Sequence, residues 1–236
     1  MKLSIIVPVK NEEKELPSLF ETLEKQTMQD FEVVVADANS RDRTRDIAKA
    51  RGARIVPGGM PGEGRNAGGA HALGDMLLFL DADVVLPSVR FIEDALKEMQ
   101  ERHIGVATVR VKPLSNHALD RFFFGIYNFY AELTERFRPH APGFCIFATK
   151  EAHEAINGFD EDVKFAEDMD YVQRAARAGF KFAILRNVPA IPTSTRRFEK
   201  DGHWRIAVKY VWAELHMIVR GPFKGKSPFT YEMGGK

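Results

Sequence analysis

Residues 76–83 read Met-Leu-Leu-Phe-Leu-Asp-Ala-Asp: five apolar residues, then two carboxylates that a single alanine separates. A short apolar run without polar alternation is typical of a strand that is buried on both faces of a sheet. Similar runs occupy residues 3–9 and 31–36, and a helical segment follows each of them. Strands that alternate with helices predict an α/β fold with a doubly wound, mostly parallel sheet flanked by helices.

The composition is that of an ordinary soluble globular protein. Hydrophobic residues make up 44% and charged residues 28% of the 236 residues, which argues against a disordered or coiled-coil chain. A formal net charge of +1 gives no reason to expect a nucleic-acid partner. The single cysteine, Cys145, excludes an internal disulfide. With neither a signal-peptide pattern nor an apolar stretch of membrane-spanning length, a cytoplasmic location is expected.

Polar segments follow three of the expected strands directly. They are Lys10-Asn11-Glu12, Asp37-Ala38-Asn39-Ser40 and Asp81-Ala82-Asp83. In open α/β sheets ligands bind beyond the carboxyl ends of the strands, so we expect these segments around one crevice. Asp81 and Asp83 offer oxygen ligands that suit a hard divalent cation, which would neutralise a diphosphate leaving group.

Two further segments allow more than one interpretation. Asp37 could accept a hydrogen bond from an imide N–H or a ribose hydroxyl, whereas Ser40 and Asp42 suit the N-cap of the next helix. Residues 62–68, Gly-Glu-Gly-Arg-Asn-Ala-Gly, predict a loop that could approach phosphates closely, with Arg65 as its cation. Its glycine spacing matches neither a dinucleotide fingerprint nor a Walker loop.

The remaining pattern predicts several more elements and a basic C-terminal end. We expect strands at residues 105–111, 144–148 and 181–185, and helices at residues 91–99, 119–137, 167–178 and 202–219. Residues 196–226 carry a local charge of +5. With the aromatic Phe122-Phe-Phe124, this charge could let the protein lie on an anionic membrane, although a packed core helix and a solvated basic face explain both features equally.

Seven short segments occur together in one order. The first half contains Ile6-Val-Pro-Val-Lys-Asn-Glu12, the Asp37 cluster, Gly64-Arg-Asn-Ala-Gly68 and Leu80-Asp-Ala-Asp83; the second contains Pro142-Gly-Phe144, Asn157-Gly-Phe-Asp-Glu161 and Glu167-Asp-Met-Asp170. This set resembles the donor and acceptor halves of family 2 glycosyltransferases of the GT-A fold. The resemblance implies a catalytic domain at residues 1–195, with its donor half at 1–111 and its acceptor half at 112–195. A basic helical extension would occupy residues 196–236.

The resemblance implies that a nucleotide-diphosphate sugar, such as a UDP- or GDP-sugar, binds to the donor half. Pro8, Asn11 and Glu12 would line the nucleoside pocket. Asp37 would contact the base, and Arg65 would lie near the base or the diphosphate.

The resemblance also implies the metal ligands and the catalytic residues. Asp83 would ligate Mg²⁺ or Mn²⁺, with Asp81 beside it on the ribose or acting through water. Asp168, next to Glu167, would be the general base of an inverting displacement at the anomeric carbon. Such a carboxylate takes the proton of the acceptor hydroxyl during attack. An acidic residue at a helix N-terminus also favours the helix dipole, and both roles can hold together.

Departures from the family pattern indicate which subgroup of the family the chain resembles. Polymer-forming members carry Gln-x-x-Arg-Trp and transmembrane helices, whereas this chain has only Trp204-Arg205 in reverse order. We therefore expect a small, soluble, non-processive member. Val84-Val85 follow the metal motif where polyprenyl-phosphate transferases often carry Leu-Gln. Arg196 and Arg197 could clamp a diphosphate, or could be surface residues of a linker.

Several functions stay open at this point. The acceptor could be a sugar hydroxyl or a lipid phosphate, and the latter would make the chain a polyprenyl-phosphate glycosyltransferase. A nucleotidyltransferase would also use a metal at a strand end, but Glu167 and Asp168 would then have no purpose. A non-catalytic nucleotide-sugar-binding module would not need Asp83 and Asp168, and both are present.

Overall fold

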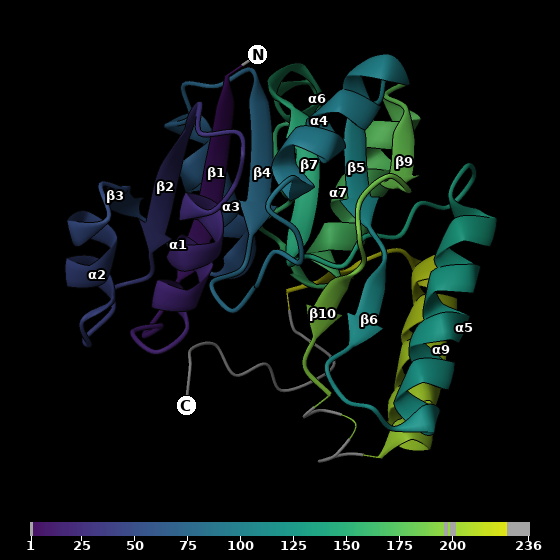
Figure 1. The fold of residues 1–236 in the computed structure, drawn as a ribbon. Helices are drawn as coiled ribbons and strands as arrows, with labels where there is room; N and C mark the ends of the chain where they lie inside the picture. Colours follow the sequence, from purple (N-terminus) through teal and green to yellow (C-terminus); the bar gives the residue numbers. More distant parts are fainter. Residues whose placement is uncertain (1, 196–197, 199–201, 226–236) are drawn as a thin grey trace.

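The computed structural model describes residues 2–195, 198 and 202–225. Its centre is a seven-stranded sheet in the order β3-β2-β1-β4-β7-β5-β9 (Figure 1). The strands are β1 (Leu3–Val9), β2 (Phe31–Asp37), β3 (Arg54–Pro57), β4 (Met76–Leu80), β5 (Val106–Val109), β7 (Cys145–Thr149) and β9 (Phe182–Leu185). All neighbouring pairs are parallel except those of β7, which runs antiparallel to β4 and β5. The predicted mostly parallel α/β sheet is confirmed.

Helices cover both faces of the sheet. They are α1 (Leu16–Glu24), α2 (Thr44–Ala50), α3 (Pro61–Ala70), α4 (Phe91–Glu101), α6 (Lys150–Ala155) and α7 (Glu167–Arg177). Successive side chains of a strand point to opposite faces. In β4, Leu78 therefore packs into the core under α1 and α4, whereas Phe79 packs into the core under α6 and α7. Burial on both faces explains why β4 is uniformly apolar and β1 mostly apolar in the sequence.

The glycine-rich segment expected to be a loop is instead helix α3, which packs closely on β1 and β2. A Cβ atom at Gly64 would lie 3.0 Å from Cβ of Pro8, and one at Gly68 would overlap with Cγ2 of Ile6. The glycines therefore allow the helix axis to approach the sheet, which a larger residue would prevent. The loop prediction was wrong because glycine also serves close helix–sheet packing.

The strand expected at residues 105–111 is divided in two. β5 ends at Val109, and β6 (Val111–Pro113) leaves the main sheet to form a parallel pair with β10 (Ile191–Thr193). A second small pair joins β8 (Val163–Phe165) to β11 (Phe223–Lys224) in antiparallel orientation.

Helices α5 (Ala118–Thr134) and α9 (His203–Arg220) lie side by side at one end of the sheet (Figure 1). They run in the same direction, because Asp120 near the start of α5 contacts His203, whereas Tyr130 later in α5 contacts Glu214. Arg138 and His140 also contact Glu214. These contacts cross the proposed domain boundary at residue 195, which stays a prediction. Among the described residues, no helix has both the length and the apolar character needed to cross a membrane.

Candidate active site

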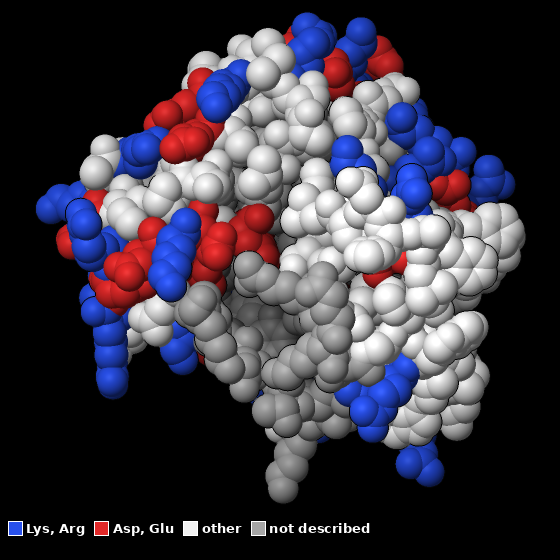
Figure 2. Space-filling model, turned by 60° about the horizontal axis from the view of Figure 1, so that its bottom comes forward, with Lys and Arg blue, Asp and Glu red and all other residues white. Residues whose placement is uncertain are grey.

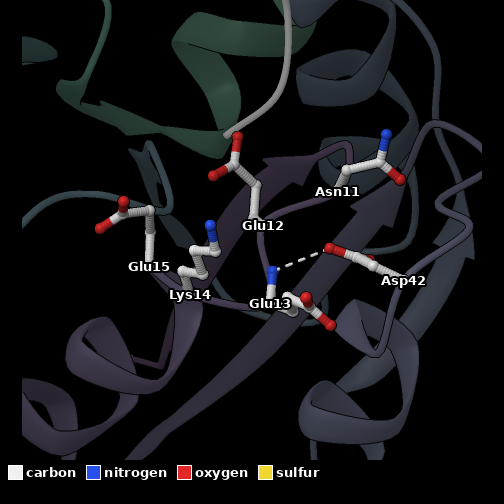
Figure 3. Close-up of a pocket in the computed structure, with 6 residues that line it drawn as sticks. All are labelled: Asn11, Glu12, Glu13, Lys14, Glu15 and Asp42. Atoms are coloured by element: carbon white, nitrogen blue, oxygen red, sulfur yellow. Dashed lines mark hydrogen bonds between the residues drawn. The ribbon is translucent and has the colours of Figure 1, made fainter. Parts of the chain in front are cut away.

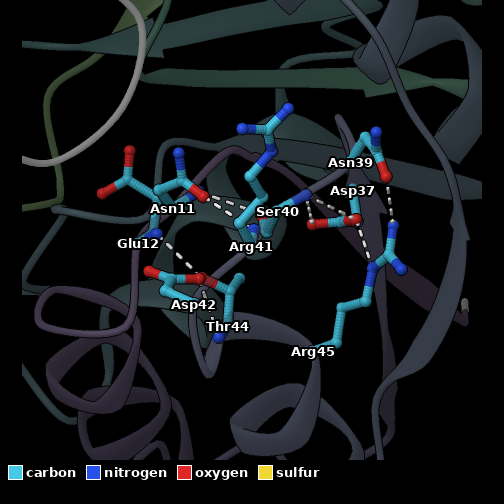
Figure 4. A network of polar contacts seen from close by, with 9 residues as sticks. All are labelled: Asn11, Glu12, Asp37, Asn39, Ser40, Arg41, Asp42, Thr44 and Arg45. Atoms are coloured by element: carbon cyan, nitrogen blue, oxygen red, sulfur yellow. Dashed lines mark hydrogen bonds and ion pairs between the residues drawn. The ribbon is translucent and has the colours of Figure 1, made fainter.

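The site begins where the loops after β1 and β2 are joined by hydrogen bonds (Figure 4). Ser40 Oγ accepts the backbone N–H of Asn11 at 2.9 Å, and Thr44 Oγ1 accepts that of Glu12 at 2.8 Å. In return, Asn11 Oδ1 accepts the N–H of Arg41 at 2.9 Å. Asn11 itself has φ 55°, a left-handed conformation that asparagine tolerates better than most residues.

These contacts correct part of the predicted helix capping. Ser40 bonds to the neighbouring loop and does not cap α2, whose N-cap residue is Arg43. Asp42 accepts the N–H of Thr44 at 3.0 Å in the first turn and also that of Glu13 at 3.1 Å. The polar residues after β2 therefore fix the shape of the loop after β1, at the carboxyl edge of the sheet.

Asp37, at the end of β2, is buried with 3% of its surface exposed. Its carboxylate accepts the N–H of Ser40 and forms an ion pair with Arg45 Nε at 2.5 Å. Arg45 also donates to Asn39 (Figure 4). Because a buried carboxylate with fixed donors keeps one orientation, Asp37 is a rigid acceptor beside the crevice.

A hollow of about 210 Å³ lies against the loop after β1 (Figure 3). It is lined by Asn11, Glu12, Glu13, Lys14, Glu15 and Asp42. Burial and the negative charges of Asp83, Glu15 and Asp81 raise the pKa of Glu12 to about 7. The ends of β1 and β4 thus meet in one field of negative potential.

The two carboxylates after β4 differ in their surroundings. Asp81 is partly exposed, and its backbone N–H donates to the carbonyl of Phe144 just before β7. Asp83 is exposed, while Ala82 between them is buried. The backbone therefore presents both carboxylates at the crevice while the intervening methyl group anchors the turn in the core.

Arg65 lies at the centre of the site and joins its two halves. Its side chain is 3% exposed and forms ion pairs with Asp81 at 3.0 Å and Glu167 at 2.9 Å. It also donates to the carbonyl of Gly143 at 3.0 Å and lies 5.4 Å from the ring centre of Phe159. The surrounding carboxylates raise the pKa of the guanidinium against the opposing effect of burial, so Arg65 stays charged.

Glu167 and Asp168 begin helix α7, after Ala166 in the left-handed conformation (φ 57°). Asp168 accepts the backbone N–H of Met169 at 2.8 Å. Burial and the adjacent Glu167 charge raise its pKa to about 7, against the opposing effects of Arg65 and the N–H donor. A carboxylate with this pKa is protonated and deprotonated near neutral pH, as proton transfer requires.

Two residues beside Asp168 had no predicted role. A Cβ atom at Gly143 would lie 3.0 Å from Oδ2 of Asp168 and 3.2 Å from Nη2 of Arg65, so a side chain there would crowd both charged groups. The glycine of Pro142-Gly-Phe144 was the available signal. Tyr127 of α5 also lies near Asp168; burial of the ring and, to a smaller extent, the charge of Asp168 raise the pKa of the phenol. No local pattern distinguished it from the other aromatic residues of α5.

The structure brings most of the predicted site residues to one edge of the sheet. Asn11, Glu12, Arg65, Asp81, Asp83, Glu167 and Asp168 surround the crevice. Pro8 lies below the crevice, within β1, where it packs against Gly64 of α3. Asp37 is buried at the rim of the crevice. Arg196 and Arg197 lie outside the described residues.

The donor set fits a divalent cation that is shared with a ligand. Among the described residues, no three His, Cys, Asp or Glu side chains form a group that could hold a metal by themselves. Burial and the nearby charges of Asp83 and Asp81 raise the pKa of Glu12, which shows that the carboxylates at the ends of β1 and β4 lie close together. Mg²⁺ and similar ions are commonly held by one or two carboxylates together with substrate phosphates.

Residues 4–152 match a family model described as "Glycosyl transferase family 2". Poly(ribitol-phosphate) beta-N-acetylglucosaminyltransferase TarS of Staphylococcus aureus is 31% identical over 134 residues, covering 52% of this chain and 23% of that protein. The amylovoran biosynthesis glycosyltransferase AmsB of Erwinia amylovora is 24% identical over 274 aligned positions, covering 100% of this chain and 86% of AmsB. The chain spans less than a third of the length of the first relatives that it matches.

Solved structures share the fold. The mannosyltransferase PcManGT of Pyrobaculum calidifontis, in complex with GDP-Man and Mn²⁺, superposes with a TM-score of 0.69 at 20% identity, covering 96% of this chain and 66% of that one. S. aureus TarS 1-349 in complex with UDP-GlcNAc superposes with a TM-score of 0.67 at 23% identity, covering 82% and 58%. The predicted GT-A fold is thereby confirmed.

Proposed function

The chain belongs to glycosyl transferase family 2, and we propose that it transfers a sugar from a nucleotide-diphosphate donor to an acceptor hydroxyl in a non-processive reaction. The observation that carries this proposal is the position of Arg65. Its guanidinium bonds to Asp81 of the predicted donor motif and to Glu167 of the predicted acceptor motif. One buried cation thus fixes the turn of Asp81 and Asp83 and the start of α7 relative to each other.

The donor nucleoside would lie against the loops after β1 and β2. Asn11 and Glu12 would line its pocket above Pro8, and the fixed carboxylate of Asp37 would accept a hydrogen bond from the base. The interlocked hydrogen bonds of these loops support a pocket that is formed before the donor binds. Little conformational entropy would then be lost on binding.

The diphosphate would bind with a divalent cation at Asp83 and Asp81. Bound there, Mg²⁺ or Mn²⁺ would neutralise charge on the nucleoside diphosphate as it leaves. A complex of GDP-Man with Mn²⁺ in the structural neighbour PcManGT supports this arrangement. The close approach of Glu12 to Asp83 and Asp81, which together with burial raises the pKa of Glu12, also supports it.

Asp168 would act as the general base. Its pKa of about 7 lets the carboxylate take the proton of an acceptor hydroxyl as the oxygen attacks the anomeric carbon. Attack from the side opposite the leaving diphosphate inverts the configuration. A phosphate acceptor is already ionised and needs no base, so a basic carboxylate at this position favours a hydroxyl.

Donor binding tests the proposal directly. Thermal unfolding of the chain should be measured with UDP, GDP and their sugars, each with and without Mn²⁺. A ligand at 100 times its Kd stabilises the native state by about 2.7 kcal/mol, which raises Tm by several degrees. We expect Asp83→Ala to abolish the metal-dependent part of this shift.

Asp30→Ala is the matched control, because Asp30 is exposed and precedes β2 at the opposite edge of the sheet. It should leave the shift unchanged. If Asp83→Ala binds nucleotide with wild-type affinity and metal response, the proposed donor site is wrong.

A further inference from the structure

Helices α5 and α9 carry most of the exposed apolar surface. Of the 21 large hydrophobic residues that the structure describes as exposed, 15 lie on these two helices or directly after α5. Exposed apolar patches made of this many side chains on a folded protein usually mark a contact with another molecule or with a membrane.

The exposed residues form one stripe on each helix. In α5 the stripe consists of Leu119, Phe122, Ile126, Phe129 and Leu133, and in α9 of Trp204, Val208, Val211, Leu215 and Val219. Spacings of three and four residues place each set on one side of its helix. We call the two stripes together the apolar face.

The apolar face points away from the rest of the protein. The opposite sides of the helices are buried, at Phe124 and Ala131 in α5 and at Ile206 and Ala213 in α9. The three phenylalanines 122–124 therefore do not act together, because Phe122 is 56% exposed and Phe124 only 9%. Packing within the described part of the chain leaves the apolar face uncovered.

The charges around this face are unbalanced. Each carboxylate in or directly after the two helices has a basic partner: Asp120 with His203, Glu132 with Arg110, Glu135 with Arg186, and Glu214 with Arg138. By contrast, Arg121, Arg136, Arg205 and Arg220 form no ion pair with any described residue. Figure 2 shows the result as a broad white area on the right, bordered by blue. The largest red area lies on the left of this view.

A basic hollow of about 370 Å³ lies beside the ends of both helices. Arg136 follows α5 and Arg177 ends α7, both are exposed, and neither is ion-paired within the described residues. Phe137 and Ile218 line the same hollow. Two free guanidinium groups next to apolar side chains offer a phosphate site at the edge of an apolar surface.

We propose that the apolar face lies on an anionic lipid bilayer, with Arg136 and Arg177 binding the phosphate of a lipid headgroup. Interfacial helices of this kind place apolar side chains among the acyl chains and basic residues among anionic headgroups. Tryptophan prefers the same interface, and Trp204 is 70% exposed on this face.

A second copy of the chain fits this surface less well. In a symmetric dimer the same patch meets itself, which would bring the unpaired arginines of one copy close to those of the other. Anionic headgroups would balance these charges, whereas another copy would add to them.

The apolar face adjoins the acceptor side of the proposed active site, and this consequence rests on the proposed function. Tyr127 projects from α5 near Asp168 and near Tyr210 of α9. Binding of the two helices to a bilayer would hold the general base close to the lipid surface. The acceptor hydroxyl would then belong to a lipid-borne molecule.

Sedimentation with vesicles tests the proposal. The full chain should bind phosphatidylcholine vesicles that contain phosphatidylglycerol, and bind pure phosphatidylcholine far less. High salt should weaken the binding by screening. The double variant Phe129→Ser, Leu133→Ser should lower the partition coefficient about 10- to 100-fold. Leu73→Ser, at an exposed apolar residue between α3 and β4, is the matched control.

Charge reversal tests the headgroup site separately. Arg136→Glu with Arg177→Glu should lower binding to the anionic vesicles by about tenfold or more. Lys25→Glu with Lys49→Glu changes the net charge equally at exposed residues near α1 and α2, and should have a much smaller effect. Equal effects of the two double variants would overturn the headgroup site.

The two tryptophans give a second readout, because Trp204 and Trp212 both lie on exposed parts of α9. Anionic vesicles should shift their fluorescence to shorter wavelength. Absence of sedimentation and of this shift at low salt would overturn the proposal. So would a dimer in analytical ultracentrifugation that persists with vesicles and dissociates in the Phe129→Ser, Leu133→Ser variant. If the protein binds nucleotide with Mn²⁺ but does not bind vesicles, this inference is wrong and the proposed function still stands.

Discussion

Apolar residues and carboxylates are distributed in opposite ways at the two ends of the molecule. At the β3-β2-β1-β4 end the apolar residues are buried in the sheet, and carboxylates occupy the surface of the crevice. At the α5–α9 end the carboxylates are paired with basic side chains, and apolar residues and arginines occupy the surface.

This difference separates the two ligands that we propose. A surface of carboxylates suits a metal-bound diphosphate. An apolar surface whose arginines form no ion pair with the described residues suits a lipid. Arg65 and Asp168 lie between the two ends, where the sugar would pass from donor to acceptor. The expected effects of substitutions should differ accordingly from one region to the other.

The largest effect is expected at Asp168. Asp168→Asn keeps the size and polarity of the side chain but cannot accept a proton. Transfer to a hydroxyl acceptor should fall about 10²–10⁴-fold while donor affinity changes little. The measurements are the initial transfer rate and donor binding.

Glu167→Gln is the neighbouring control and should be milder, because Glu167 contacts Arg65 rather than the proposed acceptor. Near-normal transfer by Asp168→Asn would remove the base assignment for a hydroxyl acceptor. If Asp168→Asn instead keeps substantial activity with a phosphate acceptor, a polyprenyl phosphate becomes the favoured acceptor.

A large loss of stability is expected at Arg65. Arg65→Met leaves the carboxylates of Asp81 and Glu167 without their buried partner, which typically costs about 3–5 kcal/mol of unfolding free energy. Arg51→Met removes an ion pair with the exposed Glu24 and should cost less than about 1 kcal/mol. Urea unfolding measures both. A similar small loss for both variants would show that Arg65 does not join the two halves.

The pH dependence of transfer should report the pKa of Asp168. Because burial raises this pKa to about 7, the carboxylate is protonated and inactive below that pH. The kcat/KM for a hydroxyl acceptor should therefore rise with pH and level off above about 7, with a tenfold fall per unit below it. Glu12→Gln should keep this acidic limb, and Asp168→Asn should lose it. A midpoint near 4 would contradict the proposed environment of Asp168.

The smallest effects are expected for the stability of two glycine variants, one at each end of the molecule. Gly68→Ala in α3 would force a methyl group against Ile6 and should destabilise the protein by about 1–3 kcal/mol. Gly125 of α5 has open space around its Cα, so Gly125→Ala should stabilise the helix by up to about 1 kcal/mol. Urea unfolding measures both changes. Equal changes in stability would contradict the contrast between a tightly packed end and an open one.

The sequence by itself determined the sheet and the edge at which the site lies. Mostly apolar runs such as residues 3–9 and 76–80 form strands because both of their faces are covered. Polar residues placed directly after such runs must lie at the carboxyl edge, because parallel strands end there together. Asn11, Glu12, Asp81 and Asp83 were therefore predicted near one another from local pattern alone.

Only the tertiary structure decided what depends on contacts between distant residues. The glycines of residues 62–68 fit a flexible loop as well as a closely packed helix, and only the presence of β1 below them selects the helix. The apolar stripes of α5 and α9 have the same period whether they face a core or the outside, because periodicity fixes a side of the helix and not its neighbour. The pKa of Asp168 likewise arises from burial and Glu167, with Arg65, 103 positions earlier in the sequence, opposing the shift. Such environments form only when the chain has folded.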